Sequence, residues 1–260
     1  PLGLGRKTGI DMEGEVTGDL PSTEWKRKRF RKPEQQKWYA GETISLGIGQ
    51  GYNNFTMLQL ASATATLVSG GQRYKPRLVR EVQDVVTGER RVLVNDALPP
   101  LPLKPEHVEL INRALYGVTQ EGTSVRSFLG ATYKSGGKTG TAQAIGVKAN
   151  EKYNAAKLEE AQRDHSLYMA FAPLEAPSIA VAVIVENAGW GSDSAAPMSR
   201  RVFDYVLNGT VPSEEDLALT REGKSTTPVG KPRPATEVLL PGAAAIALPP
   251  AVPPTQRVAQ

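Results

Sequence analysis

Apolar residues recur at helical spacing in three segments of the chain. The first begins after Thr56 and stops at a pair of glycines, which allow the left-handed turn that ends helices. The second begins at Pro105, a residue that suits a first helical turn, and the third ends at Asn208-Gly209. The spacing therefore predicts three helices, over residues 56–69, 105–120 and 196–207.

Other segments have the composition of strands. Residues 166–172 and 178–186 are apolar on both alternating faces, as in strands covered by helices on two sides, and residues 133–143 form a glycine-punctuated extended segment. The proline-bounded connection at 173–177 is too short for a crossover, so it predicts an antiparallel pair. Residues 78–94, with a turn at 87–89, predict a separate β-hairpin.

The composition changes after Tyr205, the last aromatic residue. Nine of the 20 prolines lie between Pro212 and Pro254, among Ala, Ser, Thr and charged residues. Such a segment buries too little apolar surface to offset the entropy lost on ordering, about 1–2 kcal/mol per residue. We therefore expect a folded part over residues 1–211 and a disordered Pro/Ala-rich tail over residues 212–260.

Composition and charge limit the classes of function. With 40% hydrophobic content, 260 residues are enough for a real core, and the absence of cysteine excludes disulfides and thiolate metal sites. The longest apolar run, Ile179 to Val185, is too short to cross a bilayer. The chain opens at Pro1 without a targeting signal, so we expect its true start, and any membrane anchor, to lie upstream. A net charge of +4 favours anionic partners without identifying one.

The segment Ser135-Gly136-Gly137-Lys138-Thr139-Gly140-Thr141 has three interpretations. A phosphate-binding loop needs a glycine five positions before Gly137, where Thr132 stands. A plain glycine-rich turn leaves the lysine and two hydroxyls unexplained. The third interpretation is the Lys-Thr-Gly element of penicillin-binding proteins and serine β-lactamases. In an extended strand, Thr139 and Thr141 would place both hydroxyls on one face, beside the charge of Lys138, to bind a carboxylate.

The flanking segments support the third interpretation. In chain order they are Gly3-Leu4-Gly5-Arg6-Lys7-Thr8-Gly9-Ile10-Asp11, Gly47-Ile48-Gly49-Gln50-Gly51, Gly137-Lys138-Thr139-Gly140-Thr141-Ala142-Gln143, Asp164-His165, Phe171-Ala172-Pro173 and Val185-Glu186-Asn187. This series resembles class B penicillin-binding proteins, especially their elongation-specific branch. The resemblance covers residues 1 to 208 and identifies the folded part as the C-terminal part of a transpeptidase domain whose N-terminal part is missing.

The resemblance implies an α+β fold with a central antiparallel sheet flanked by helices on both faces. It implies a peptidoglycan D,D-transpeptidase that cross-links stem peptides through a serine acyl-enzyme, without a cofactor or a metal. Lys138 and Thr139 would bind the substrate carboxylate, Gly140 would permit close approach, and Thr141 would belong to the oxyanion hole and to the substrate site. Further expected partners are β-lactam antibiotics and a SEDS-family glycan polymerase, at the periplasmic side of the bacterial inner membrane.

The sequence departs from this family pattern at the nucleophile. No Ser-x-Asn triplet occurs, and Ser135 to Lys138 is the one formal Ser-x-x-Lys, on a segment whose glycines oppose the helix that this motif must open. We interpret that match as a coincidence and expect the chain alone to be inactive. A membrane would be contacted only through a missing N-terminal anchor.

Two alternative functions remain at this point. A β-lactamase-like hydrolase shares the Lys-Thr-Gly element and differs in its deacylation machinery. A nucleic-acid or polyanion-binding module would use the basic cluster Lys26 to Lys32, although a solvated basic loop explains this cluster better and the flanking motifs argue against nucleic acid. His107 and His165 have no partners at ligand spacing, which argues against a metal site.

Overall fold

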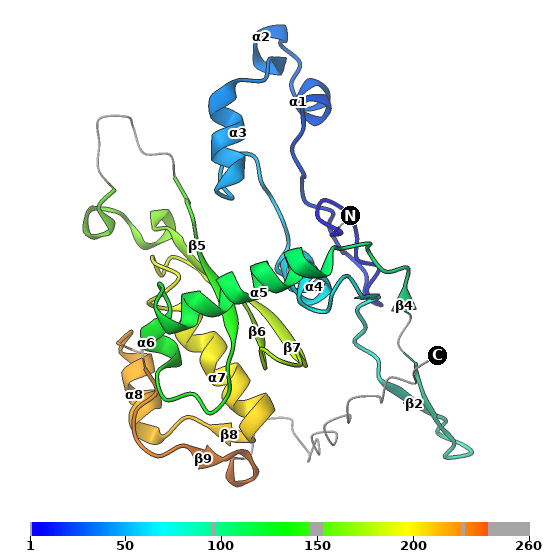
Figure 1. The fold of residues 1–260 in the computed structure, drawn as a ribbon, viewed down its shortest axis with the longest axis vertical. Coiled ribbons are helices and arrows are strands. Elements are labelled where there is room, and N and C mark those ends of the chain that lie inside the picture. The colour runs from blue at the N-terminus through cyan, green and yellow to red at the C-terminus, as the bar shows by residue number, and fades with distance from the viewer. Residues whose placement is uncertain (1, 95–96, 146–152, 225–226, 239–260) are drawn as a thin grey trace.

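The computed structural model describes residues 2–94, 97–145, 153–224 and 227–238. At its centre is an antiparallel sheet in the order β5-β6-β7 (Figure 1). Its strands are β5 (Gly136–Ala142), β6 (His165–Ala172) and β7 (Ile179–Val185). These are the three strands that the apolar pattern predicts, and the short connection at 173–177 joins an antiparallel pair as expected.

The register of the sheet decides which way each side chain of β5 points. Thr139 lies opposite Tyr168, and Lys138 lies opposite Met169. Side chains alternate along a strand, and cross-strand partners share a face. Thr139 and Thr141 therefore point to one face of the sheet, and Lys138 points to the other.

Helices cover both faces, as the resemblance implies. On the face of Met169 lie α4 (Met57–Val68) and α5 (Pro105–Gln120), and Thr64 of α4 contacts the Met169 sulfur at 3.8 Å. On the face of Tyr168 lie α6 (Val125–Phe128) and α7 (Ala195–Asn208). The buried cluster on this second face consists of Phe128, Tyr168, Ala170, Ala172, Ala195, Ala196 and Phe203.

The helix boundaries follow the local signals in the sequence. The Thr56 side chain caps α4 by accepting a hydrogen bond from the Gln59 backbone amide at 3.1 Å. The Gln59 side-chain oxygen in turn accepts from the Thr56 backbone amide. Pro105 occupies the first turn of α5. Gly209 ends α7 with a φ of 63°, a left-handed conformation that glycine adopts without strain. All three predicted helices are confirmed.

Residues 19–54 form an extension that leaves the fold beside α4 and projects away from it, here called the arm (Figure 1). Its base is closed by an antiparallel bridge in which the Asp19 amide donates to the Asn54 carbonyl at 2.6 Å. Its helices are α1 (Thr23–Arg29), α2 (Pro33–Gln36) and α3 (Ala40–Gly47). No helix in the described part of the chain combines the length and apolar character that a bilayer crossing needs.

Short strands and turns lie outside the central sheet and its covering helices. β1 (Arg73–Tyr74) pairs with β4 (Ala97–Leu98), and β2 (Glu81–Gln83) pairs with β3 (Arg90–Val92). The latter pair confirms the predicted hairpin with shorter strands. Two 3-10 turns, η1 (Ala155–Lys157) and η2 (Glu160–Gln162), precede β6.

The disordered tail predicted over residues 212–260 is wrong for its first half. β8 (Thr210–Val211) pairs with β9 (Arg233–Pro234), and α8 (Glu214–Arg221) and η3 (Ala235–Glu237) complete the segment. Residues 239–260 lie outside the described residues.

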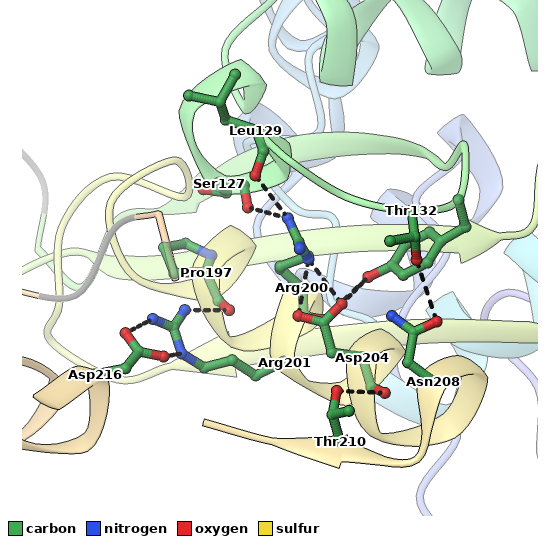
Figure 2. A network of polar contacts seen from close by, with 11 residues as sticks. Ser127, Leu129, Thr132, Pro197, Arg200, Arg201, Asp204, Asn208, Thr210 and Asp216 are labelled. Atoms are coloured by element: carbon green, nitrogen blue, oxygen red, sulfur yellow. Dashed lines mark hydrogen bonds and ion pairs between the residues drawn. The ribbon is translucent and has the colours of Figure 1, made fainter. Parts of the chain in front are cut away.

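The order of α8 has a local cause and a tertiary cause. Ser213 caps the helix by accepting from the Asp216 amide at 3.0 Å. Asp216 is 1% exposed and forms an ion pair with Arg201 of α7, seen in Figure 2.

A second ion pair lies on α7, between Arg200 and Asp204 at 2.9 Å. Asp204 also accepts a hydrogen bond from the Tyr133 hydroxyl, and Arg200 donates to the Ser127 carbonyl of α6. Burial and the nearby Asp204 carboxylate raise the pKa of Tyr133 above its usual value.

Candidate functional site

β5 has one paired edge and one open edge. It pairs with β6, and no second strand of the described ranges pairs with it. Two of its carbonyls accept hydrogen bonds from side chains, Thr139 from the Lys138 ammonium at 2.7 Å and Thr141 from the Gln50 amide at 2.5 Å. The N–H and C=O of a residue in an antiparallel pair point to the same side. Thr139 and Thr141 therefore direct their N–H groups to the open edge as well.

The open edge lines a cleft of about 650 Å³. Besides Lys138 and its neighbours on β5, the cleft is lined by Thr123 of the α5–α6 turn and by Ile48 and Gln50, which follow α3 in the arm. Trp190 of the β7–α7 loop closes another side and is 69% exposed. The cleft is therefore assembled from segments that are far apart in the sequence.

The Lys-Thr-Gly-Thr segment presents hydrogen-bond donors at this edge. Thr139 and Thr141 share a face, as the sequence predicts. Lys138 starts from the opposite face, but its side chain folds along the strand until the ammonium meets the Thr139 carbonyl. An ammonium, two hydroxyls and two outward N–H groups together form a surface suited to an anion.

Two residues of the cleft were missed by sequence reasoning. Thr123 Oγ1 lies 3.0 Å from Thr139 Oγ1. Gln50 sits between Gly49 and Gly51, both with positive φ. The contact from Gln50 to Thr141 spans 91 residues of sequence. Only the folded chain brings these residues together, so no local pattern could have identified them.

Glycines allow the backbone segments around β5 to approach one another closely. A Cβ on Gly137 would lie 2.2 Å from the Tyr168 hydroxyl. A Cβ on Gly191 would lie 2.3 Å from the Leu167 carbonyl and 2.7 Å from the Gly140 carbonyl. The absence of a side chain at Gly191 therefore lets the loop after β7 lie against the backbone of Gly140 and Leu167.

The formal Ser-x-x-Lys match does not form a nucleophile. Ser135 is 2% exposed and directly precedes β5, and its carbonyl accepts from the Thr119 hydroxyl at 2.7 Å. Three residues of extended strand separate it from Lys138 by roughly 10 Å. A serine in this position cannot reach a substrate in the cleft or use Lys138 as its base.

The basic cluster Lys26 to Lys32 is not simply a solvated loop. Its first half is the helix α1, and Lys26 is 3% exposed. The Lys26 ammonium bonds Glu42 and the carbonyl of Lys37, the latter at 2.7 Å. It also lies 5.2 to 6.0 Å from the centres of three aromatic rings, those of Trp38, Tyr39 and Tyr52.

This ion pair has an electrostatic consequence. The hydrogen bond from Lys26, together with the backbone bond from Tyr39, holds the pKa of Glu42 below its usual value. The five other cations of the cluster are exposed, Arg27, Lys28, Arg29, Arg31 and Lys32. One member of the cluster thus stabilises the arm, and only the rest match the predicted solvated charge.

The two histidines lie apart. His107 is exposed in the first turn of α5. His165 begins β6, and its Nδ1 accepts a hydrogen bond from the Asn187 amide at 3.0 Å. Within the described ranges, no group of three or more His, Cys, Asp or Glu side chains lies close enough to hold a metal ion.

Comparison with known proteins places this geometry in a family. The model of the penicillin binding protein transpeptidase domain matches residues 1–204. The peptidoglycan D,D-transpeptidase MrdA of Haemophilus influenzae is 42% identical over 218 residues, which cover 82% of this chain and 32% of that protein. The chain thus spans about a third of the length of the curated relatives it matches.

Solved structures agree. PBP2 of Pseudomonas aeruginosa, in complex with WCK 5153, is 36% identical with a TM-score of 0.62, over 79% of this chain and 42% of that one. PBP2 of Helicobacter pylori, in complex with MreC, is 26% identical with a TM-score of 0.59, over 76% of this chain and 33% of that one. The chain with the open Lys138–Thr141 edge therefore belongs to the penicillin-binding protein transpeptidase domain family, in the class B branch of PBP2.

Proposed function

We propose that this chain supplies the substrate-binding wall of a peptidoglycan D,D-transpeptidase, as its C-terminal part. The observation that carries the proposal is the open edge of β5, where Lys138, Thr139 and Thr141 direct donors into a cleft within a transpeptidase-family domain. The substrate would be a stem peptide of peptidoglycan, whose terminal carboxylate such a donor surface can bind.

Each residue of the segment has a distinct role in this proposal. Lys138 and Thr139 bind the terminal carboxylate of the donor peptide. Gly140, which has no side chain, permits the close approach of neighbouring groups to the strand. Thr141 offers its outward N–H to the oxyanion that forms when the donor carbonyl is attacked. Loss of one oxyanion donor typically costs about 2.7–4 kcal/mol of transition-state stabilisation.

The nucleophile belongs to another part of the protein in this account. Ser135 is buried and no Ser-x-Asn triplet occurs in the 260 residues. The catalytic serine and its lysine base would come from the part of the relatives' length that this chain does not span. The chain alone is therefore expected to be inactive, and the complete protein to be acylated by β-lactams.

The same family membership supports a cellular setting. By its likeness to the MrdA and PBP2 relatives, the complete protein would act in peptidoglycan synthesis on the periplasmic side of the inner membrane. A membrane anchor outside these residues would hold it there. The PBP2 structure solved with MreC makes a scaffold of that kind a candidate partner for the complete protein. A SEDS-family glycan polymerase is the further partner that we propose, because cross-linking acts on newly polymerised strands.

The test uses the complete protein with a pentapeptide donor and an amine acceptor. A transpeptidase releases the terminal D-alanine and forms a cross-linked product, and it stays acylated after reaction with penicillin. Rapid turnover of penicillin without a cross-linked product would instead indicate the β-lactamase-like hydrolase. The chain alone should release no D-alanine, and release by the chain alone would contradict an external nucleophile.

A further inference from the structure

Two threonine hydroxyls meet at the rim of the cleft. Thr123 stands on the turn between α5 and α6, and Thr139 stands on β5. Their oxygens lie 3.0 Å apart, and either one could donate the shared proton. Both residues line the cleft, and Thr123 is exposed.

The turn that carries Thr123 is fixed from below by buried contacts. Thr119 donates to the Ser135 carbonyl at 2.7 Å, just before β5. Ser124 shares a 2.8 Å hydrogen bond with Tyr168, the cross-strand partner of Thr139. Burial raises the pKa of Tyr168 above its usual value, so the phenol stays neutral and can complete this bond at any physiological pH.

These buried contacts hold the turn in place beside the Thr123–Thr139 pair. A hydroxyl at the exposed rim of a cleft can bond water equally well, so the pair itself contributes little to stability. The position of Thr123 is nevertheless set by the two bonds that flank it, from Thr119 and Ser124. The consequence of the pair is therefore to orient a proton.

We propose that Thr123 is a positioning residue for the substrate carboxylate. A hydroxyl has one proton to donate and lone pairs to accept. When Thr123 donates to Thr139 Oγ1, the proton of Thr139 is left free to point into the cleft, toward the carboxylate. Thr123 thereby restricts the orientation of the Thr139 hydroxyl, so that its proton already points toward the anion. This inference rests on the proposed function, in which Thr139 binds that carboxylate.

The test compares two probes on the complete protein, benzylpenicillin and its methyl ester, in which the carboxylate charge is masked. Thr123→Val removes the hydroxyl and keeps the shape of the side chain. We expect it to slow acylation by benzylpenicillin about fivefold, the effect of one neutral hydrogen bond, and to change the methyl ester rate less than about twofold. The acid-over-ester preference should fall accordingly. Thr123→Ser, which keeps the hydroxyl, should restore that preference.

The matched control is Thr132→Val. Thr132 is an exposed threonine outside the cleft, bonded to Asn208 at 3.2 Å. It should change neither probe's rate. Equal slowing of both probes by Thr123→Val would show a merely structural role and overturn the proposal.

A second outcome separates this inference from the proposed function. If Thr123→Val keeps the full acid-over-ester preference while Thr139→Val loses it, Thr123 has no positioning role and the proposed function stands. If Lys138→Ala and Thr139→Val both keep the preference, the carboxylate does not bind at β5 and both proposals fail.

Discussion

Lys26 and Lys138 carry the same charge in opposite surroundings. Lys26 is 3% exposed, and its ammonium is neutralised by Glu42 within an aromatic cage. Lys138 is exposed at the cleft, and its ammonium bonds only a carbonyl among the groups described. A carboxylate paired with Lys138 would meet a charge that no acidic side chain among the described residues neutralises. The surroundings therefore make Lys26 structural and leave Lys138 available for a ligand.

The Lys26–Glu42 pair predicts how the arm responds to acid. The pKa of Glu42 is lowered in the folded chain, so its stabilising effect is present above the usual value of 4.5 and is lost as pH falls through the lower folded value. The fluorescence of Trp25 and Trp38, read in a Trp190→Phe background, should change below pH 4.5. Glu42→Gln should already show the altered signal at pH 7.

The control is Glu24→Gln. Glu24 pairs with Lys28 on the same arm but is 71% exposed. This variant should keep the wild-type acid transition, because exposed pairs contribute little. Identical pH profiles for wild type and Glu42→Gln would contradict a role for the buried pair.

At the residue scale, the sequence predicts only those functional residues that lie together in one short motif. Lys138 to Thr141 could be identified because their residue types and spacing are themselves the signal. The burial of Lys26 could not, because its partner Glu42 lies 16 residues away on another helix. Thr123 and Gln50 were missed for the same reason.

At the scale of elements, α8 is held to α7 by a buried ion pair. The side chains of Arg201 and Asp216 are 10% and 1% exposed. Removing one member of a buried pair typically costs about 3–5 kcal/mol, because the other charge stays buried without that partner. The docking of α8 on α7 therefore depends strongly on the Asp216 carboxylate.

Asp216→Ala should release α8. We expect the free energy of opening of the α8 amides, measured by hydrogen exchange, to fall by about 3 kcal/mol. Glu214→Ala removes an ion pair with Arg233 from the same helix, where Glu214 is 71% exposed, and should cost at most about 1 kcal/mol. Equal protection in both variants would show that the ion pair does not hold the helix.

The elements differ in how far the sequence could predict them. The helices α4, α5 and α7 and the strands of the sheet carry clear periodicity, so their existence was predicted and only their ends shifted. α8 is short and proline-flanked, and the residue that orders it, Arg201, lies on the preceding helix. Composition alone therefore predicted disorder where a tertiary contact supplies order.

At the scale of the whole molecule, the open edge of β5 faces a cleft that distant segments complete. The arm supplies Gln50, the α5–α6 turn supplies Thr123, and the β7–α7 loop supplies Trp190. β5 directs an ammonium, two hydroxyls and two N–H groups to the cleft, and its two carbonyls there already accept from Lys138 and Gln50. Ser135 is buried beside the strand. In the proposed function, the sheet is an anion-binding wall, and the attacking group comes from a part of the protein outside the described residues.

The rate of covalent labelling of the complete protein by a fluorescent penicillin tests this account most directly. Lys138→Ala should lower the second-order labelling rate about 10- to 100-fold, because it removes a charged donor to the penicillin carboxylate. Lys134→Ala, which removes an exposed ion pair with Glu175 outside the cleft, should label within about twofold of wild type. Labelling of Lys138→Ala at the wild-type rate would contradict the carboxylate-binding role of the β5 edge.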